Sequence, residues 1–127
     1  MQLIQNVVVK QILTETSKDE LLRQFQERKL QFQKECDQLQ FELKRLERSK
    51  NFSQAALIKH FEKEIQMRRE KIKLLEFQIE QLHILPLGSE LKETEVQALV
   101  EVKVGDAWNP VQHQTIIIRD GIIEEIR

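Results

Sequence analysis

The chain has 127 residues and carries 20 basic against 21 acidic side chains, so its formal net charge is −1. This length predicts one folding unit, and a single cysteine excludes an internal disulfide bond. No apolar run approaches the roughly 18 residues of a membrane-spanning helix, and no signal peptide is visible. The composition therefore predicts a cytoplasmic protein that has no membrane partner.

A strand over residues 2–14 begins the predicted fold. The segment QLIQNVVVKQILT is rich in β-branched residues and has no helical spacing. Ser17 follows as a candidate N-cap, and Glu20, three residues later, completes the sequence pattern of a capping box. These two residues predict that a helix begins at Ser17.

Two ladders of core positions, whose spacings alternate between three and four residues, fill the middle of the chain. They are Leu22, Phe25, Lys29, Phe32, Cys36, Leu39, Leu43 and Leu46, and then Ile58, Phe61, Ile65, Arg68, Ile72, Leu75, Ile79 and Leu82. A stripe that repeats about every 3.5 residues is typical of the seam of a coiled coil. The two basic members, Lys29 and Arg68, are expected either to fix the register or to keep their charges in water while their stems are buried.

The two ladders are out of phase by one residue. A skip residue in one continuous helix and a turn both explain the break. Asn51 tolerates left-handed geometry and Ser53 can cap a new helix, so the sequence favours a turn near residues 49–53. Folding the chain about Phe52 pairs positions whose numbers sum to 104, which gives an antiparallel helical arm over residues 17–84.

Pro86 and Gly88 end the second helix, and the pattern then changes to a period of two. Alternation of apolar and polar residues predicts a half-buried strand. Asp120-Gly121, between two runs of isoleucine, predicts a tight β-hairpin. Residues 94–127 are therefore expected to form the C-terminal β-strands.

Together these elements predict an α+β fold. A long antiparallel helical hairpin, or coiled coil, projects from a small, mostly antiparallel β-sheet or partial barrel that both termini build. One shared sheet is expected because a two-stranded piece is barely stable alone.

Basic residues are concentrated around the expected turn. Residues 44–73 contain ten lysines and arginines against four acids. We expect this basic tip to contact an anionic partner, namely RNA or a ribosomal particle. The candidate residues are Arg45, Arg48, Lys50, Phe52 and Lys59, of which the aromatic ring can stack on an unpaired base. The alternative interpretation is a solvated coiled-coil surface on which basic residues cluster by chance.

Five apolar side chains lie outside both ladders, at Leu30, Phe41, Met67, Leu74 and Phe77. The intramolecular seam cannot bury all of them, so they predict contact with the sheet or with another chain. A homo-oligomer that forms through the arm is the preferred interpretation.

Residues that support catalysis are sparse. The sequence has no phosphate-binding loop, nucleophile elbow or metal-binding motif. His60 and His83 lie at opposite ends of the expected arm, so they cannot share a metal ion within one chain. Trp108 is more simply explained as the cap of a small sheet than as a ligand anchor. We therefore expect a protein that is not an enzyme, takes no cofactor and has no small-molecule substrate.

Several segments resemble the YlqD family of small bacterial proteins. They include VVVKQILTE, KECDQLQFELKRLE, EKIKLLEFQIEQLHILPLGSE and IIIRDGIIEEI, and the resemblance spans the chain. It implies a cytoplasmic protein whose gene often lies near ribosome-maturation and tRNA-methylation genes. The shared motifs are structural, so they supply no active-site residues.

These observations lead to two functional hypotheses. The first is a non-enzymatic interaction protein that binds RNA or a ribosomal particle through the basic tip of the arm. The alternative is a structural or scaffolding oligomer that binds protein partners through the apolar surface of the arm.

Overall fold

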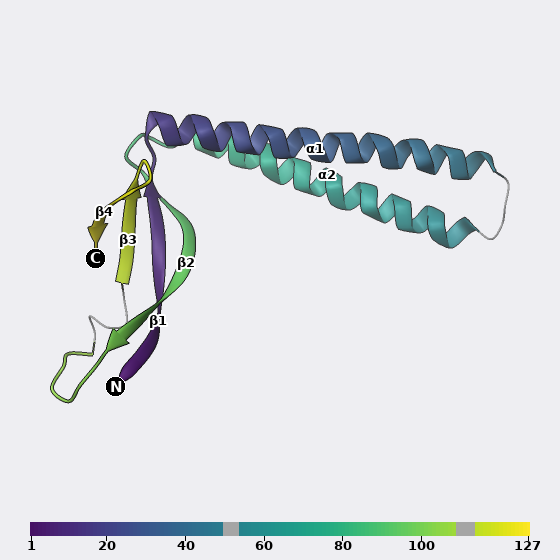
Figure 1. The fold of residues 1–127 in the computed structure, drawn as a ribbon. Helices are drawn as coiled ribbons and strands as arrows, with labels where there is room; N and C mark the ends of the chain where they lie inside the picture. Colours follow the sequence, from purple (N-terminus) through teal and green to yellow (C-terminus); the bar gives the residue numbers. More distant parts are fainter. Residues whose placement is uncertain (50–53, 109–113) are drawn as a thin grey trace. The chain divides into compact units, whose positions relative to one another are not determined.

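The computed structural model describes residues 1–49, 54–108 and 114–127. Within these ranges the elements are β1 (Gln2–Ile12), α1 (Glu15–Arg48), α2 (Ala55–Ile84), β2 (Glu90–Glu101), β3 (Gln114–Arg119) and β4 (Ile122–Ile126) (Figure 1). They form two compact units: a sheet unit of Met1–Asp19 with Leu85–Arg127, and a helical hairpin of Glu20–Ile84. The predicted α+β class, with two long helices and a sheet built from both termini, is confirmed.

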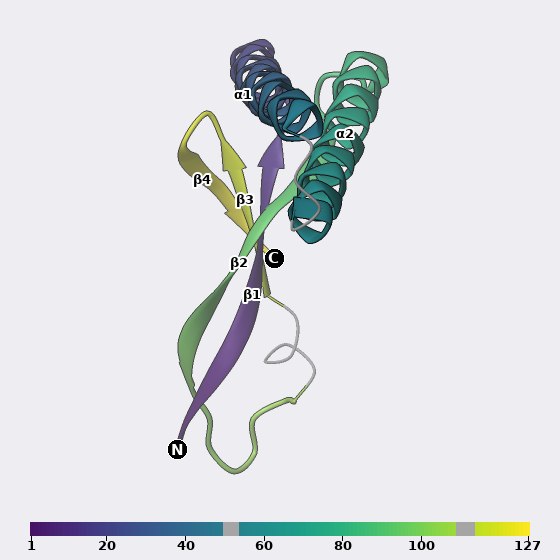
Figure 2. The same ribbon diagram turned by 90° about the vertical axis from the view of Figure 1, so that its right-hand side faces the viewer.

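The sheet has four strands in the order β2-β1-β3-β4. β1 pairs antiparallel with β2 and parallel with β3, while β3 and β4 form an antiparallel hairpin. The sheet is thus mixed but mostly antiparallel, as the sequence predicts. Figure 2 shows β1 and β2 twisting together along their length, which is the usual right-handed consequence of L-amino acids in long strands.

The core of the sheet unit consists mainly of β-branched side chains. Val7, Val9, Ile12 and Ile117 are buried, together with Leu13. β-branched residues fit a pleated, half-buried surface, which explains why they dominate β1 and β3.

β2 begins at Glu90, four residues earlier than its sequence period suggests. Its first residues pair with Gln11 and Ile12 of β1, beyond a register shift between Val9 and Lys10. Such an irregularity changes which face each side chain occupies, so a period of two cannot be followed across it.

α1 begins at Glu15, and its cap differs from the predicted one. The Thr14 hydroxyl accepts a hydrogen bond from the Ser17 backbone N–H (3.1 Å), and the Ser17 hydroxyl accepts one from the Thr14 backbone N–H (2.8 Å). The predicted capping box of Ser17 and Glu20 is therefore wrong. Thr14 is the N-cap of α1, and Ser17 is the third helical residue, which completes the capping box. β1 ends at Ile12 and the helix already begins at Glu15, so Ser17 lies inside the helix and cannot be its N-cap.

The predicted turn at Asp120-Gly121 is confirmed. Both residues have positive φ angles, 49° and 81°, as a type I′ hairpin turn requires. The Asp120 carboxylate also accepts a 2.6 Å hydrogen bond from the Thr14 hydroxyl. The β-hairpin is thereby connected to the start of α1.

One ion pair joins the two outer strands of the sheet. Arg127, which follows β4, lies 2.7 Å from Glu90 of β2, and Lys10 lies 4.0 Å from the same carboxylate. The hydrogen bond from Arg127 lowers the pKa of Glu90 below its ordinary value. This contribution to stability is therefore present above the ordinary glutamate pKa and is lost as pH falls through the lowered pKa of the folded state.

α1 and α2 lie side by side and run antiparallel (Figures 1 and 2). Every position of both predicted ladders is buried or half-buried, and the least exposed are Cys36, Ile65, Leu75 and Leu82. α1 ends at Arg48, so the alternative of one continuous helix is wrong. The turn is predicted near residues 49–53, and of these residues 50–53, with the candidates Lys50 and Phe52, lie outside the described residues.

The box at the start of α1 gives a test of the local structure. Thr14→Ala removes the acceptor for the Ser17 backbone N–H and the bond to Asp120, so it should lower the free energy of unfolding by about 1–2 kcal/mol. The matched control is Thr16→Ala, which alters an exposed side chain of the same turn and should change stability by less than about 0.5 kcal/mol. Urea unfolding followed by circular dichroism measures both values. Equal stabilities for the two variants would contradict the assigned cap.

Candidate functional site

The basic members of the two ladders make ion pairs across the hairpin. Lys29 Nζ lies 3.3 Å from Glu76 of α2, and Arg68 Nε lies 3.7 Å from Glu35 of α1. The paired residue numbers sum to 105 and 103, which agrees with the predicted sum of 104. The charged group of each basic ladder residue therefore lies beside a carboxylate of the opposite helix. These two ion pairs define which residues of α1 and α2 face each other.

These ion pairs also distinguish the two sides of the hairpin. In an antiparallel pair of helices, the residues that flank the seam meet their counterparts on the same side. Lys29 and Glu76 lie on one side, which we name the Glu76 side. Arg68 and Glu35 lie on the other, which we name the Glu35 side. Lys71, whose ammonium group lies 5.2 Å from the centre of the Phe32 ring, is also on the Glu35 side.

Arg68 is the centre of a small network on the Glu35 side. Its guanidinium group donates a hydrogen bond to the Glu64 carboxylate, one helical turn earlier. This bond is the main reason why the pKa of Glu64 is lowered and that of Arg68 is raised. Arg68 Nε and Glu35 Oε2 are buried and face each other beyond hydrogen-bonding distance, so their interaction is electrostatic.

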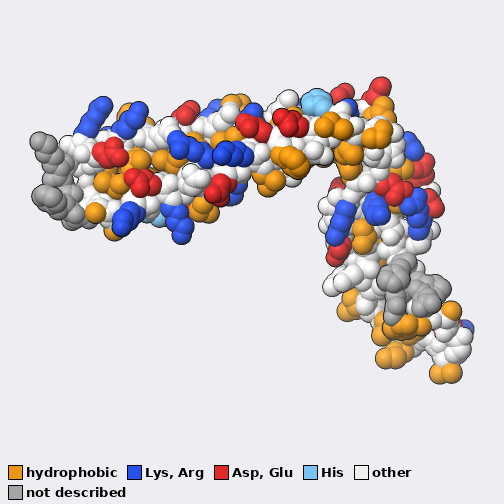
Figure 3. Space-filling view, turned by 180° about the vertical axis from the view of Figure 1, so that it is seen from behind, with side chains coloured by type: hydrophobic (Ala, Val, Ile, Leu, Met, Phe, Trp, Pro, Cys, Tyr) orange, Lys and Arg blue, Asp and Glu red, His pale blue; other side chains and the backbone are white. Residues whose placement is uncertain are grey.

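The half of the hairpin nearer Arg48 and Ala55, residues 35–48 and 55–69, carries exposed basic side chains, and we name it the turn end. Among the described residues, five of these have no ion-pair partner. We name them the distal basic surface: Lys44, Arg48, Lys59, Lys63 and Arg69. Figure 3 shows lysine and arginine side chains gathered over this half of the hairpin.

The sequence-based candidates for this surface fall into three groups. Arg48 and Lys59 are exposed and unpaired within the described part of the chain. Arg45 is exposed but lies 3.7 Å from Glu42, one turn earlier. The sequence contains that signal, because Glu42 and Arg45 have the three-residue spacing of a helical ion pair. Lys44, Lys63 and Arg69 join the surface because nothing described neutralises them.

A shallow groove of about 290 Å³ lies between the helices on the Glu76 side. It is lined by Gln40, Leu43, Glu62, Ile65, Gln66 and Arg69. Amide, carboxylate and guanidinium groups surround the two apolar ladder residues, Leu43 and Ile65. This surface is suited to polar contacts rather than to a buried apolar ligand.

The five apolar candidates are exposed, with exposed fractions of 51% for Leu30, 63% for Phe41, 41% for Met67, 56% for Leu74 and 57% for Phe77. Helical spacing does not place them in one patch. Leu30 and Leu74 are at the same level of the hairpin, but the heptad assigns Leu30 to the Glu76 side and Leu74 to the Glu35 side. The three residues of α2 instead share one outward stripe.

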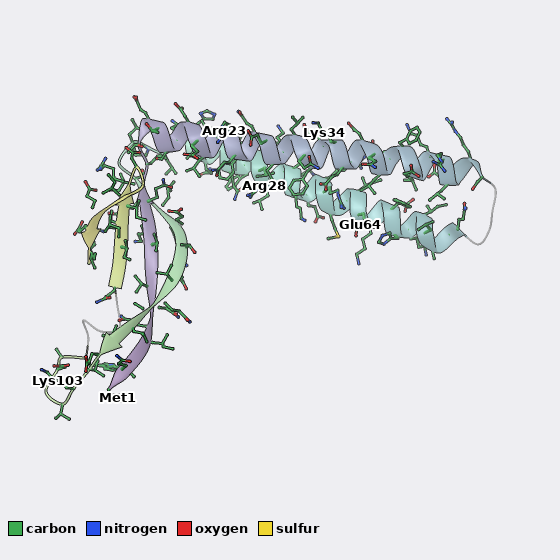
Figure 4. All side chains as sticks on the ribbon, in the orientation of Figure 1. Met1, Arg23, Arg28, Lys34, Glu64 and Lys103 are labelled. Carbon is green, nitrogen blue, oxygen red and sulfur yellow. The ribbon has the colours of Figure 1, made fainter. Side chains whose placement is uncertain are left out.

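A second hollow, of about 460 Å³, lies at one end of the sheet unit. Met1, Val102, Lys103, Val104, Asp106, Ala107 and Trp108 line it, and Figure 4 shows Met1 and Lys103 near each other there. Trp108 remains 57% exposed and Val104 is fully exposed. The predicted role of Trp108 as a cap of the sheet stays a prediction. Residues 109–113, which follow Trp108 and include His113, lie outside the described residues.

Within the described ranges, no three histidine, cysteine, aspartate or glutamate side chains are placed to hold a metal ion. Cys36 is a buried free thiol whose sulfur lies 3.9 Å from the Ile65 carbonyl oxygen. No helix in the described part of the chain is long and apolar enough to cross a membrane.

A mixed four-stranded sheet from both termini and an antiparallel pair of long helices define the fold class. A crystal structure of a protein of unknown function from Synechococcus sp. WH 8102 has a similar fold. Its TM-score is 0.77 with 19% sequence identity, and the match covers 100% of this chain and 94% of that one.

The sequence comparisons are more specific. The profile of the YlqD family, described as YlqD protein, matches residues 1–127. The chain is 46% identical over 128 residues to the "Uncharacterized protein YlqD" of Bacillus subtilis (strain 168), and the match covers 100% of this chain and 98% of that protein. The chain therefore belongs to the YlqD family.

The Arg68 network predicts a large effect of charge reversal at one rung. Arg68→Glu places a third carboxylate between Glu35 and Glu64, in a partly buried position, so it should lower the free energy of unfolding by about 2 kcal/mol or more. Arg69→Glu makes the same change in net charge at the adjacent exposed position and should cost less than about 0.5 kcal/mol. Thermal and urea unfolding of both variants measure the difference. Indistinguishable stabilities would show that Arg68 is not part of a structural ion-pair network.

Proposed function

We propose that this protein is a non-enzymatic RNA-binding protein that contacts RNA, alone or within a ribosomal particle, through the distal basic surface. The observation that carries the proposal is the set of exposed lysine and arginine side chains, without ion-pair partners in the described part of the chain, at the turn end of the helical hairpin. These side chains come from both helices, and the antiparallel pairing brings them to the same end.

The electrostatics of this surface support an anionic partner. The chain as a whole has a net charge of −1, whereas residues 44–63 contain six bases and two acids. A local positive field attracts phosphates at short range, while the rest of the chain, which has a net charge of −5, repels them and so reduces non-specific binding elsewhere. Each phosphate contact releases counterions, which provides a favourable term that does not depend on the base sequence.

The position of these bases on a coiled coil supports a binding rather than a catalytic role. The ladders and their ion pairs hold the helices, so the basic side chains can be presented without a binding pocket. Phosphate contacts of this kind position a protein on nucleic acid, and they need no enclosed site.

A second candidate function rests on a different observation. The exposed apolar residues of the arm, Leu30, Phe41, Met67, Leu74 and Phe77, suit a structural or scaffolding oligomer that binds protein partners. Affinity capture from cell lysate, with and without nuclease, separates the two candidates. Partners lost after nuclease treatment support RNA binding, and partners retained support the scaffold.

The RNA-binding proposal predicts a local and salt-dependent effect. The tip variant changes Lys44, Arg48 and Lys59 to Gln, which removes three charges outside both ladders. Its affinity for a labelled single-stranded RNA, measured by fluorescence anisotropy at low salt, should fall by about tenfold or more. The slope of log affinity against log salt should become shallower by about 2, since each lost contact contributes about 0.7.

The matched control changes Arg23, Arg28 and Lys34 to Gln, which removes the same charge from exposed positions of α1 that lie at least ten residues before Lys44 (Figure 4). This control should keep wild-type affinity to within about threefold. Equal weakening of both variants would show binding that is not located at the turn end. Absence of RNA binding by the wild-type protein at low salt would overturn the proposal.

A further inference from the structure

The outward stripe of α2 is longer than the apolar candidates suggest. Six exposed residues continue it with alternating spacings of three and four: Met67, Glu70, Leu74, Phe77, Gln81 and Ile84. These spacings define a second heptad seam, about opposite the one that faces α1. Four of the six are apolar, and Ile84 is 73% exposed.

The order of apolar and polar residues in this second seam is self-complementary. When a second copy of α2 lies antiparallel, with paired residue numbers that sum to 151, Leu74 meets Phe77 of the other copy and Met67 meets Ile84. The polar residues meet each other, because Glu70 faces Gln81, whose amide can donate a hydrogen bond to the carboxylate. Apolar residues therefore face apolar ones, and polar residues face polar ones, at every position.

The residues that flank the seam are complementary in charge. In the hairpin itself, the antiparallel register determines which charged residues meet, as the seam residues Lys29 and Arg68 show by pairing with the flanking residues Glu76 and Glu35. The same geometry places Lys73 beside Glu80 of the other copy, and two-fold symmetry produces this ion pair twice. Both side chains are exposed and make no ion pair within the described part of the chain.

Other arrangements of the same stripe are less favourable. If the antiparallel pair shifts by one heptad in one direction, Glu70 of one copy lies opposite Leu74 of the other. A shift in the other direction places Phe77 opposite Gln81. In a parallel pair, Glu70 of one copy meets Glu70 of the other, and Lys73 no longer lies beside Glu80. Like charges and unmatched polar groups at a seam are destabilising, so the antiparallel register with sum 151 is selected.

We propose that two copies of this chain associate through the outward stripe of α2, antiparallel and centred between Leu74 and Phe77, with Lys73 of each copy paired to Glu80 of the other. The partner is a second copy because the stripe complements itself in both apolar pattern and charge. This interface is independent of RNA binding by the distal basic surface, and it gives the scaffold candidate a specific geometry.

A charge swap tests the register. Lys73→Glu and Glu80→Lys each replace two ion pairs by two like-charge contacts, so each should raise the dimer dissociation constant by about tenfold at low salt. The double variant with both changes restores opposite charges and should return to within about threefold of wild type. Sedimentation equilibrium measures all four proteins, in which a dimer has twice the 15.2 kDa mass of one chain.

A disulfide test is independent of charge. In a Cys36→Ala background whose circular dichroism matches wild type, Met67→Cys and Ile84→Cys are prepared as separate chains. Oxidation of the mixture should give the heterodimer, while neither chain alone should cross-link, because two copies of one position lie about 25 Å apart along the antiparallel pair. Cross-linking of each chain with itself would overturn the antiparallel arrangement.

The matched apolar control compares Phe77→Glu with Phe41→Glu. Both residues are exposed phenylalanines, but Phe41 lies on α1, outside the stripe. Phe77→Glu should give monomers with helical content retained, and Phe41→Glu should leave the dimer unchanged. A monomeric wild-type protein at micromolar concentration, or a double charge swap that fails to recover, would reject the proposed interface. RNA affinity measured on the same variants keeps this result separate from that of the distal basic surface.

Discussion

The register between α1 and α2 depends on two ion pairs, which Lys29 and Arg68, the basic members of an otherwise apolar seam, make with Glu76 and Glu35 at its edges. Apolar rungs alone permit a slide by one heptad, because leucine and isoleucine fit many partners. A slide would instead bring Lys29 beside Arg69 in one direction or His83 in the other, so the cation would lose its carboxylate. The Arg68–Glu35 pair discriminates further, since a slide in one direction replaces Glu35 by Arg28.

The surfaces used in both proposals follow from this register. It places the basic ends of two helices together, so that Lys44 and Arg48 of α1 join Lys59 and Lys63 of α2 in one positive region. It also turns the Met67–Ile84 stripe of α2 away from α1, because a helix that buries one seam presents the residues half a turn away to solvent. A coiled coil can therefore serve two interactions at separate positions without a pocket.

The sequence predicted the parts of this fold that depend on periodicity. The ladders, the antiparallel pairing and the Asp120-Gly121 turn each follow from residue spacing, and they are confirmed. The parts that depend on tertiary contacts were missed. The start of β2 depends on a register shift opposite Lys10, and the cap of α1 depends on how soon the chain leaves β1. The candidate surface was only partly predictable. Charge density and the three-residue spacing of Glu42 and Arg45 can be found in the sequence, whereas the set of basic residues that stay unpaired depends on the side-chain geometry.

The distance between Gln33 and Arg69 tests the central claim, the register of the hairpin, most directly. Both residues are exposed and flank the seam on the Glu76 side. Spin labels at these two positions, in a Cys36→Ala background and diluted with unlabelled chain, report the distance within one molecule. Antiparallel helices whose axes lie about 8–10 Å apart predict a single short distance, below roughly 25 Å with the label arms included. A distance near 54 Å, which 36 residues of continuous helix would span, or a second population displaced by about one heptad, would contradict this account.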